Sequence, residues 1–115
     1  LQTLVPVMLD FVSKGRLTIE RFVDLTSHGP ARIFGIAGKG RIAEGYDADM
    51  TIVDLSAKRE ISNEWIESRC KWTPYHGMTV TGWPKGTILR GCRVMWEDTI
   101  IGKATGQPSR FIEAL

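Results

Sequence analysis

Histidine and cysteine are scarce in this chain of 115 residues, which has two of each. A catalytic metal site needs several histidine, cysteine or carboxylate ligands that converge on one point. His28 and His76 form neither a His-x-His nor a His-Glu-x-x-His pattern. Cys70 and Cys92 are too few for a disulfide framework, and neither has a histidine beside it in sequence, so we interpret both as free structural thiols. Local spacing therefore predicts no metal site and no cysteine nucleophile.

Long hydrophobic runs and a strong net charge are also missing. Fifteen Lys+Arg stand against thirteen Asp+Glu, and a formal charge of +2 is too small to imply a polyanionic partner. Asp10, Ser13 and Lys14 interrupt the first apolar stretch well before the roughly 20 residues that a membrane span needs. No basic segment precedes a hydrophobic run, which argues against a secretory signal. A hydrophobic fraction of 43% with 24% charged residues predicts one globular cytoplasmic domain.

The first third of the chain has the pattern of helices. Apolar residues at i, i+3, i+4 and i+7 predict a helix over residues 4–14. Thr18 is placed to cap a second helix, and Gly29-Pro30 is placed to open a short third helix that stops at Gly35. Val7 lies off the main apolar stripe, so we expect the first helix to need neighbours on two sides.

From Gly40 onward the pattern changes to that of strands. Arg90-Gly91 is typical of the tight turn of a hairpin, and Ser62 is placed to cap a short helix over 63–68. The tail from 102 to 108 contains glycine and proline and is expected to be irregular. Extended segments are predicted over residues 41–43, 50–55, 78–81, 87–89 and 92–96.

Two residue groups in the strand region could carry a function. Asp47, Asp49 and Asp54 form an acidic cluster, but no histidine or glutamate joins them nearby. We favour a turn and a strand start at Asp47 and Asp49, where the side chains can bond backbone amides, over a metal site. Basic and aromatic residues alternate farther along, and such a surface can stack nucleic-acid bases. Acidic residues are scattered through the same stretch, so we favour core or interface tryptophans and no nucleic-acid partner. The group comprises Arg69, Lys71, Trp72, Tyr75, Trp83, Lys85, Arg90, Arg93 and Trp96.

Three blocks of sequence resemble a known family over about residues 4–111. Pro30-Ala31-x-x-Phe34-Gly35 and Gly45-x-Asp47-Ala48-Asp49 resemble the carboxy-terminal part of cyclic amidohydrolases, and allantoinases and hydantoinases share them. The succession Pro74-Tyr75-x-Gly77, Gly82-Trp83-Pro84 and Arg90-Gly91 is similar to the end of a dihydroorotase.

The resemblance implies an α+β fold that is part of a larger enzyme. Residues 1–38 would be the terminal helices of a (β/α)₈ amidohydrolase barrel, and residues 39–115 the C-terminal part of its small composite β-sandwich. The parent enzyme would interconvert dihydroorotate and N-carbamoyl-L-aspartate in pyrimidine biosynthesis. A binuclear zinc centre, held by histidines, a carboxylated lysine and an aspartate, would activate the attacking water.

None of the family's catalytic or metal-binding residues can be carried onto a position of this sequence. In the family those residues belong to segments upstream of Leu1, and Asp47 and Asp49 match a turn of the sandwich. We therefore expect a C-terminal fragment that is structural and inactive alone, with no catalytic, cofactor-binding or metal-binding residue and no bound zinc. Its expected partners are the missing N-terminal barrel, a second copy through self-association, and aspartate carbamoyltransferase. The cyclic amide substrate would bind to the parent enzyme. The alternatives are a fragment of an allantoinase or hydantoinase, or a non-catalytic interaction module derived from the family.

Overall fold

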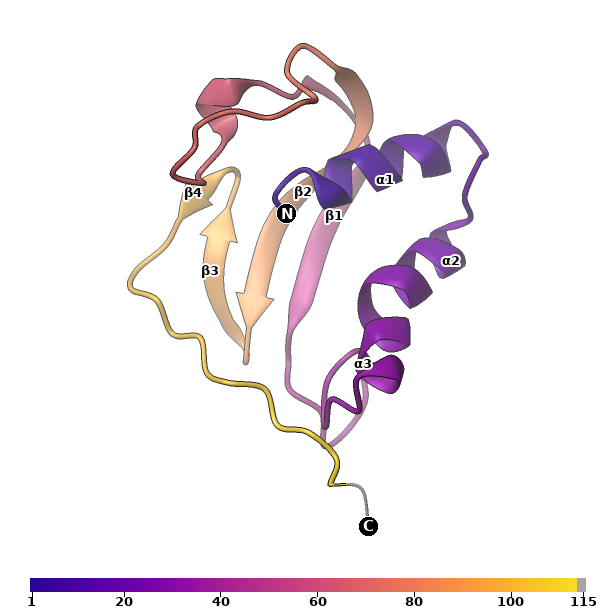
Figure 1. Cartoon of the computed structure of the whole chain (residues 1–115), viewed down its shortest axis with the longest axis vertical. Coiled ribbons are helices and arrows are strands. Elements are labelled where there is room, and N and C mark those ends of the chain that lie inside the picture. Colours follow the sequence, from indigo (N-terminus) through magenta and orange to yellow (C-terminus); the bar gives the residue numbers. More distant parts are fainter. Residues whose placement is uncertain (114–115) are drawn as a thin grey trace.

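The computed structural model describes residues 1–113, which form a helical part followed by an antiparallel sheet (Figure 1). The helices are α1 (Leu4–Ser13), α2 (Ile19–Val23) and α3 (Gly29–Ile33). A π-helical turn, Asp24–His28, joins α2 to α3, so the two helices predicted separately form one continuous helical stretch. Thr18 caps α2 as expected, because its hydroxyl oxygen accepts a hydrogen bond from the Arg21 amide at 3.1 Å.

The sheet has four strands in the order β1-β2-β3-β4, each antiparallel to its neighbours. The predicted hairpin is confirmed, and Arg90 and Gly91 both adopt positive φ in its turn. The short β4 was not predicted. The strands are β1 (Met50–Glu60), β2 (Thr79–Leu89), β3 (Cys92–Trp96) and β4 (Thr99–Ile100).

Strand β2 continues through a stretch where the sequence predicts a break. Gly82, Pro84 and Gly86 separate the two predicted strand segments, yet all three lie within one strand. The pairing with β1 steps from Gly86 to Pro84 and leaves Lys85 without a partner, as in a β-bulge. A bulge is one of the few places where a sheet accepts proline, because the regular ladder of hydrogen bonds is already interrupted there.

Two expectations about local structure are wrong. Residues 41–43 form no strand, because they follow the bend at Gly40 and pair with no other segment of residues 1–113. The helix predicted over 63–68 is a single 3₁₀ turn, Asn63–Trp65, and the Ser62 side chain does not cap it. The tail from 102 to 108 is irregular as expected.

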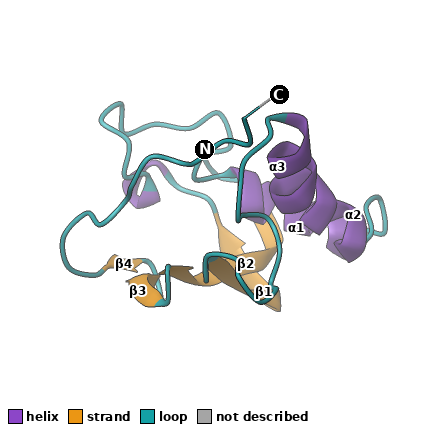
Figure 2. Ribbon diagram, turned by 90° about the horizontal axis from the view of Figure 1, so that it is seen from below, coloured by secondary structure: helices purple, strands orange, loops and turns teal. Residues whose placement is uncertain are grey.

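Helix α1 packs on β2, and the described helices lie on one side of the sheet (Figure 2). The approach is close at Gly82, where an added Cβ would lie 2.5 Å from the Cβ of Leu9. Beside it, the buried Asp10 carboxylate accepts a hydrogen bond from the Thr81 amide at 3.1 Å. A small core of Ile61, Val80 and Trp83 lies nearby. Gly82 allows α1 to approach β2 closely, and the hydrogen bond from Thr81 to Asp10 fixes α1 at one position along β2.

The tail returns from β4 to the end of α3 (Figure 1). Its last part pairs with the segment after α3: the Ala37 amide donates to the Arg110 carbonyl at 2.8 Å, and the Ile112 amide donates to the Gly35 carbonyl at 2.7 Å. The Arg90 guanidinium also donates to the carbonyl of Thr105. Every described residue of the tail is nevertheless exposed, so backbone hydrogen bonds hold it rather than buried side chains.

Candidate functional site

Residues 1–113 bring together no group of three or more histidine, cysteine or carboxylate side chains that could hold a metal ion. Both ring nitrogens of His28 face the Arg41 guanidinium, at 3.3 and 3.0 Å. The Nδ1 of His76 accepts a hydrogen bond from the Asn63 amide at 3.0 Å. The two histidines do not fit a binuclear zinc centre, because His28 faces the Arg41 cation and His76 already accepts the Asn63 amide.

Two aspartates of the acidic cluster form ion pairs with a lysine of the same chain. The Lys39 ammonium contacts Asp47 at 2.9 Å and also Asp49, whose other oxygen accepts the Arg90 amide at 2.8 Å. Burial raises the pKa of Asp49, but the hydrogen bonds from Lys39 and Arg90 outweigh it and hold that pKa below its usual range. Hydrogen bonds to both carboxylates raise the pKa of Lys39. The cluster therefore ties the loop after α3 to the β2-β3 turn.

The third aspartate and the two cysteines have no catalytic partner among the described residues. The Asp54 carboxylate accepts hydrogen bonds from the Ser56 amide at 2.9 Å and the Ala57 amide at 3.1 Å, and these bonds, Ser56 foremost, lower its pKa. Cys70 and Cys92 are exposed free thiols. His76 is held by Asn63, so nothing in this arrangement prepares either thiol as a nucleophile.

The basic and aromatic residues are divided between a packed cluster and the surface. The Asp98 carboxylate accepts hydrogen bonds from the indole N–H groups of Trp65 at 3.0 Å and Trp83 at 3.1 Å, and its other oxygen pairs with Arg59 at 2.7 Å. Arg59 also lies 4.6 Å from the centre of the Trp83 ring. Two indoles held in this way are not free to stack on bases. Trp72, in contrast, is 60% exposed on a loop.

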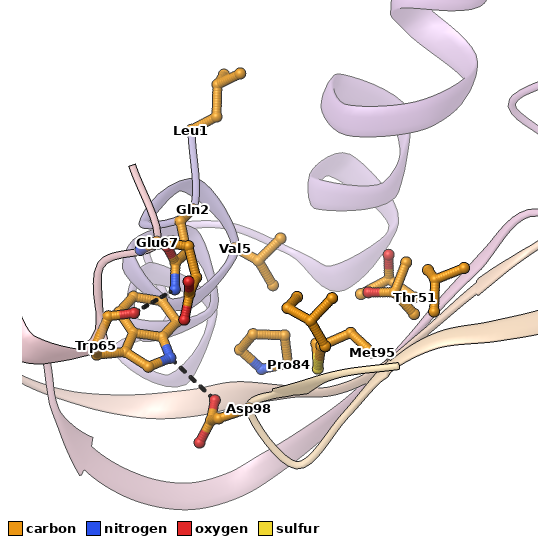
Figure 3. Close-up of a pocket in the computed structure, with 12 residues that line it drawn as sticks. Leu1, Gln2, Val5, Thr51, Trp65, Glu67, Pro84, Met95 and Asp98 are labelled. Atoms are coloured by element: carbon orange, nitrogen blue, oxygen red, sulfur yellow. Dashed lines mark hydrogen bonds between the residues drawn. The ribbon is translucent and has the colours of Figure 1, made fainter. Parts of the chain in front are cut away.

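An apolar groove lies between the start of α1 and the sheet, and all four strands contribute residues to its lining (Figure 3). Its volume is about 490 Å³. Leu1, Val5 and Trp65 line one side of it. The sheet supplies the floor with Thr51, Pro84, Thr87, Val94, Met95 and Ile100, and the remaining lining residues are Gln2, Glu67 and Asp98.

The chain exposes far more surface than a compact protein of its size. Its accessible surface is 8254 Å², whereas a folded monomer of 12.9 kDa exposes about 6,300 Å². The radius of gyration is 15.2 Å, against about 13 Å for a compact domain of this length. Large apolar side chains are exposed, among them Leu1, Ile33, Phe34, Ile42, Phe111 and Ile112. Exposed side chains of this kind favour contact with another polypeptide, so the candidate site is a contact surface.

Comparison with known proteins assigns the family. The family model described as the amidohydrolase family matches residues 2–94. The chain belongs to the amidohydrolase family. It is 44% identical over 107 residues to a dihydroorotase of Pyrococcus furiosus, covering 93% of this chain and 26% of that enzyme. It is 40% identical over 101 residues to a dihydroorotase of Methanothermobacter thermautotrophicus, covering 88% of this chain and 23% of that enzyme.

The fold of the chain is similar to part of a solved amidohydrolase. It matches the L-hydantoinase (dihydropyrimidinase) from Arthrobacter aurescens with a TM-score of 0.82 and 38% identity, covering 86% of this chain and 22% of that protein. The resemblance to dihydroorotases and hydantoinases expected from the sequence is thus confirmed. The chain spans about a quarter of the length of the relatives that it matches.

The contact surface contains features that the sequence did not reveal. In the sequence, Asp10 only interrupts an apolar run. Thr81, the residue whose amide hydrogen-bonds to it, is 71 positions away. Asp98 has no special position in the motifs, yet it joins two tryptophans that are 18 residues apart. Val7, which lies off the main apolar stripe of α1, packs against the core cluster of the chain itself, whereas Leu4 and Phe11 of the same helix are exposed.

Proposed function

We propose that this chain is the scaffold part of a dihydroorotase-like cyclic amidohydrolase of the cytoplasm, and that the parent enzyme interconverts dihydroorotate and N-carbamoyl-L-aspartate. The observation that carries the proposal is the identity of 40–44% to two dihydroorotases over 88–93% of the chain. In this reaction water adds across the ring amide and opens the ring, and the reverse step expels water. The zinc centre that would activate this water belongs to other parts of the parent, because the donors described above do not fit it.

The role of this chain is then to support the catalytic part by contact. Residues 1–38 would be helices on the outside of the barrel, and residues 39–115 would contribute strands to the composite sandwich. The surface area supports this role. The excess over a compact monomer is about 1,900 Å², more than twice the roughly 800 Å² that each partner buries in a standard interface. Part of this excess comes from the extended tail, whose described residues are all exposed.

A chimeric enzyme tests the proposal. The 107-residue region of the Pyrococcus furiosus dihydroorotase that aligns with this chain is replaced by the chain itself. We expect the chimera to fold and to turn over dihydroorotate, and the chain alone to show neither turnover nor zinc binding. A chimera that folds without turnover, or turnover by the isolated chain, would contradict the proposal.

A hydantoinase parent is the second candidate, because the structural match is to an L-hydantoinase. The same replacement made in the L-hydantoinase from Arthrobacter aurescens distinguishes the two. Side chains that evolved against a dihydroorotase barrel should pack less well on the hydantoinase host. We therefore expect the dihydroorotase chimera to retain the larger fraction of its host's thermal stability and activity. The opposite order would favour the hydantoinase.

A further inference from the structure

The side chain of Gln2 joins the start of α1 to the loop that follows the 3₁₀ turn. Its amide nitrogen donates to the Trp65 carbonyl at 2.8 Å, and its amide oxygen accepts from the Glu67 backbone amide at 2.9 Å (Figure 3). These partners lie 63 and 65 positions away in the sequence. Because both polar atoms of one side chain are used, the two bonds fix where the loop lies and how it is oriented at the start of α1.

Arg69 lies at the tip of this loop. Lys71 has a φ of 51°, and its amide donates to the Ser68 carbonyl at 3.0 Å, which closes a tight turn with Arg69 in the second position. The Lys71 ammonium is already engaged, since it donates to the Ile66 carbonyl at 2.9 Å and lies 4.0 Å from the Glu67 carboxylate. Arg69 is exposed and forms no ion pair among residues 1–113. Its guanidinium is therefore available to an anion from outside the chain.

The direction of α1 decides which face of the parent enzyme this loop borders. In a (β/α)₈ barrel the loops that lead from each strand into the next helix form the catalytic face, so every barrel helix begins at that face. Residues 1–38 are proposed above to be barrel helices, and α1 begins at Leu4. Gln2 then belongs to a loop of the catalytic face, and the loop that it holds lies beside it. The other end of α1, about 15 Å away, faces the opposite side of the barrel.

From these observations we infer that the loop of residues 66–72 borders the substrate entrance of the parent enzyme, where Gln2 holds the loop and Arg69 attracts the anionic substrate. The inference rests on the proposed function and deepens it. Dihydroorotate carries a carboxylate that takes no part in ring opening, whereas the hydantoin ring carries none. A cation at the entrance favours the anion over a neutral molecule, and at low ionic strength its attraction reaches over roughly 30 Å. Arg69 is then a specificity residue and Gln2 a positioning residue.

Steady-state kinetics of the dihydroorotase chimera test the role of Arg69. Arg69→Gln should lower kcat/KM for dihydroorotate by about two- to tenfold at low ionic strength. The change should lie in KM, because the carboxylate is attracted equally in the ground state and in the transition state. The effect should disappear in about 1 M salt, where the screening length is only about 3 Å.

The matched control is Arg16→Gln, which removes an exposed cation beyond the other end of α1. Its distance from the catalytic face predicts a change in kcat/KM of less than about 1.5-fold. Equal effects of the two substitutions, or a loss for Arg69→Gln that persists in 1 M salt, would overturn the inference.

A double-mutant cycle tests the role of Gln2. Gln2→Met keeps the length of the side chain and loses both hydrogen bonds, and hydrogen exchange of the Glu67 amide in the isolated chain should become faster. In the chimera, Gln2→Met should raise KM, and Arg69→Gln should have a smaller effect in that background, because the loop no longer holds the guanidinium at the entrance. Unchanged exchange, or effects on KM that are simply additive, would contradict the role of Gln2.

The outcomes separate the inference from the proposed function. A chimera that turns over dihydroorotate with the same KM in the presence and absence of Arg69→Gln leaves the proposed function intact and rejects the inference. A folded chimera without turnover rejects the proposed function and the inference together. The L-hydantoinase chimera supplies the last comparison, since its hydantoin substrate is uncharged and its KM should not respond to Arg69→Gln. A response as large as that for dihydroorotate would overturn charge attraction as the role of Arg69.

Discussion

Asp10 is the polar residue that most directly joins the helical part to the sheet. Its carboxylate is buried, accepts the Thr81 amide and pairs with Lys14. Burial alone raises the pKa of Asp10, but the hydrogen bonds from Lys14 and Thr81 outweigh this effect and lower it. A buried group of this kind stabilises the fold through its partners and is costly to remove, since the partner amide would then be left without an acceptor.

Asp10→Ala should lower the free energy of unfolding by about 1–3 kcal/mol at neutral pH, measured by urea denaturation. Because the native pKa is depressed, the charged carboxylate stabilises the fold above the ordinary pKa of about 3.9 and ceases to do so as the pH falls through the native value. The difference between wild type and variant should therefore shrink below about pH 4. Asp24→Ala, which removes an exposed ion pair with Arg21, is the control and should cost less than about 1 kcal/mol. Equal costs for the two variants would be evidence against the role of Asp10.

Gly82 is the second residue whose identity the packing requires. Its φ is +105°, and an added Cβ would lie 2.5 Å from the Cβ of Leu9. Gly82→Ala should destabilise the chain by about 2–5 kcal/mol, from backbone strain and from displacement of α1. Gly45→Ala, at φ +82° in open space, should cost only the strain of about 1–2 kcal/mol. Chemical denaturation of both variants measures the difference, and a Gly82 variant as stable as the Gly45 variant would mean that α1 can move away freely.

At the scale of elements, the β3-β4 turn is strained. Glu97 and Asp98 have φ values of 45° and 64°, in the left-handed region where asparagine and glycine are preferred. Asp98 is held there by Trp65, Trp83 and Arg59. The Glu97 side chain makes an exposed contact with Lys85 at 3.6 Å, and the Glu97 amide donates to the Lys85 carbonyl at 2.8 Å. Side-chain partners therefore offset the strain at Asp98, whereas Glu97 is held by a backbone hydrogen bond that another residue at this position would keep.

Replacing Glu97, whose side chain makes only an exposed contact, should stabilise the hairpin. Glu97→Asn is expected to raise the free energy of unfolding by about 0.5–1 kcal/mol, because asparagine tolerates the left-handed conformation better. Glu97→Gln removes the same charge without easing the backbone and should change stability by less than about 0.5 kcal/mol. Thermal unfolding of the two variants gives the comparison. A gain of equal size for both would assign the effect to charge instead of conformation.

The elements predictable from sequence are those whose signals are local. The Thr18 cap and the Arg90-Gly91 turn depend on a few adjacent residues, and both are confirmed. The continuity of β2 through Pro84 could not be predicted, because it depends on a bulge that exists only once β1 is paired beside it. The Asp98 cluster and the groove were equally hidden, since side chains from distant segments form them. The family motifs did indicate that the chain carries no catalytic residue, which stays a prediction until turnover is measured.

For the whole molecule, the exposed apolar area predicts the behaviour of the isolated chain. An accessible surface of 8254 Å², with the outer edges of β1 and β4 unpaired among the described residues, favours association between copies. We expect light scattering to report species larger than 12.9 kDa and the dye ANS to show enhanced fluorescence on binding. In the dihydroorotase chimera both signals should decrease, because the host covers the same surface. A monomeric chain without ANS binding would contradict this prediction.

The long-range contact between α1 and β2 has a consequence for synthesis on the ribosome. Asp10 and Thr81 are separated by 71 positions in the chain. At a translation rate of about 5–20 residues per second, the first helix leaves the exit tunnel roughly 4–14 seconds before the strand that it packs on. During that interval β2, the strand on which α1 packs, is not yet available to cover its apolar stripe. Nascent chains arrested between these two residues should therefore be bound by chaperones, and chains extended beyond β2 should be released.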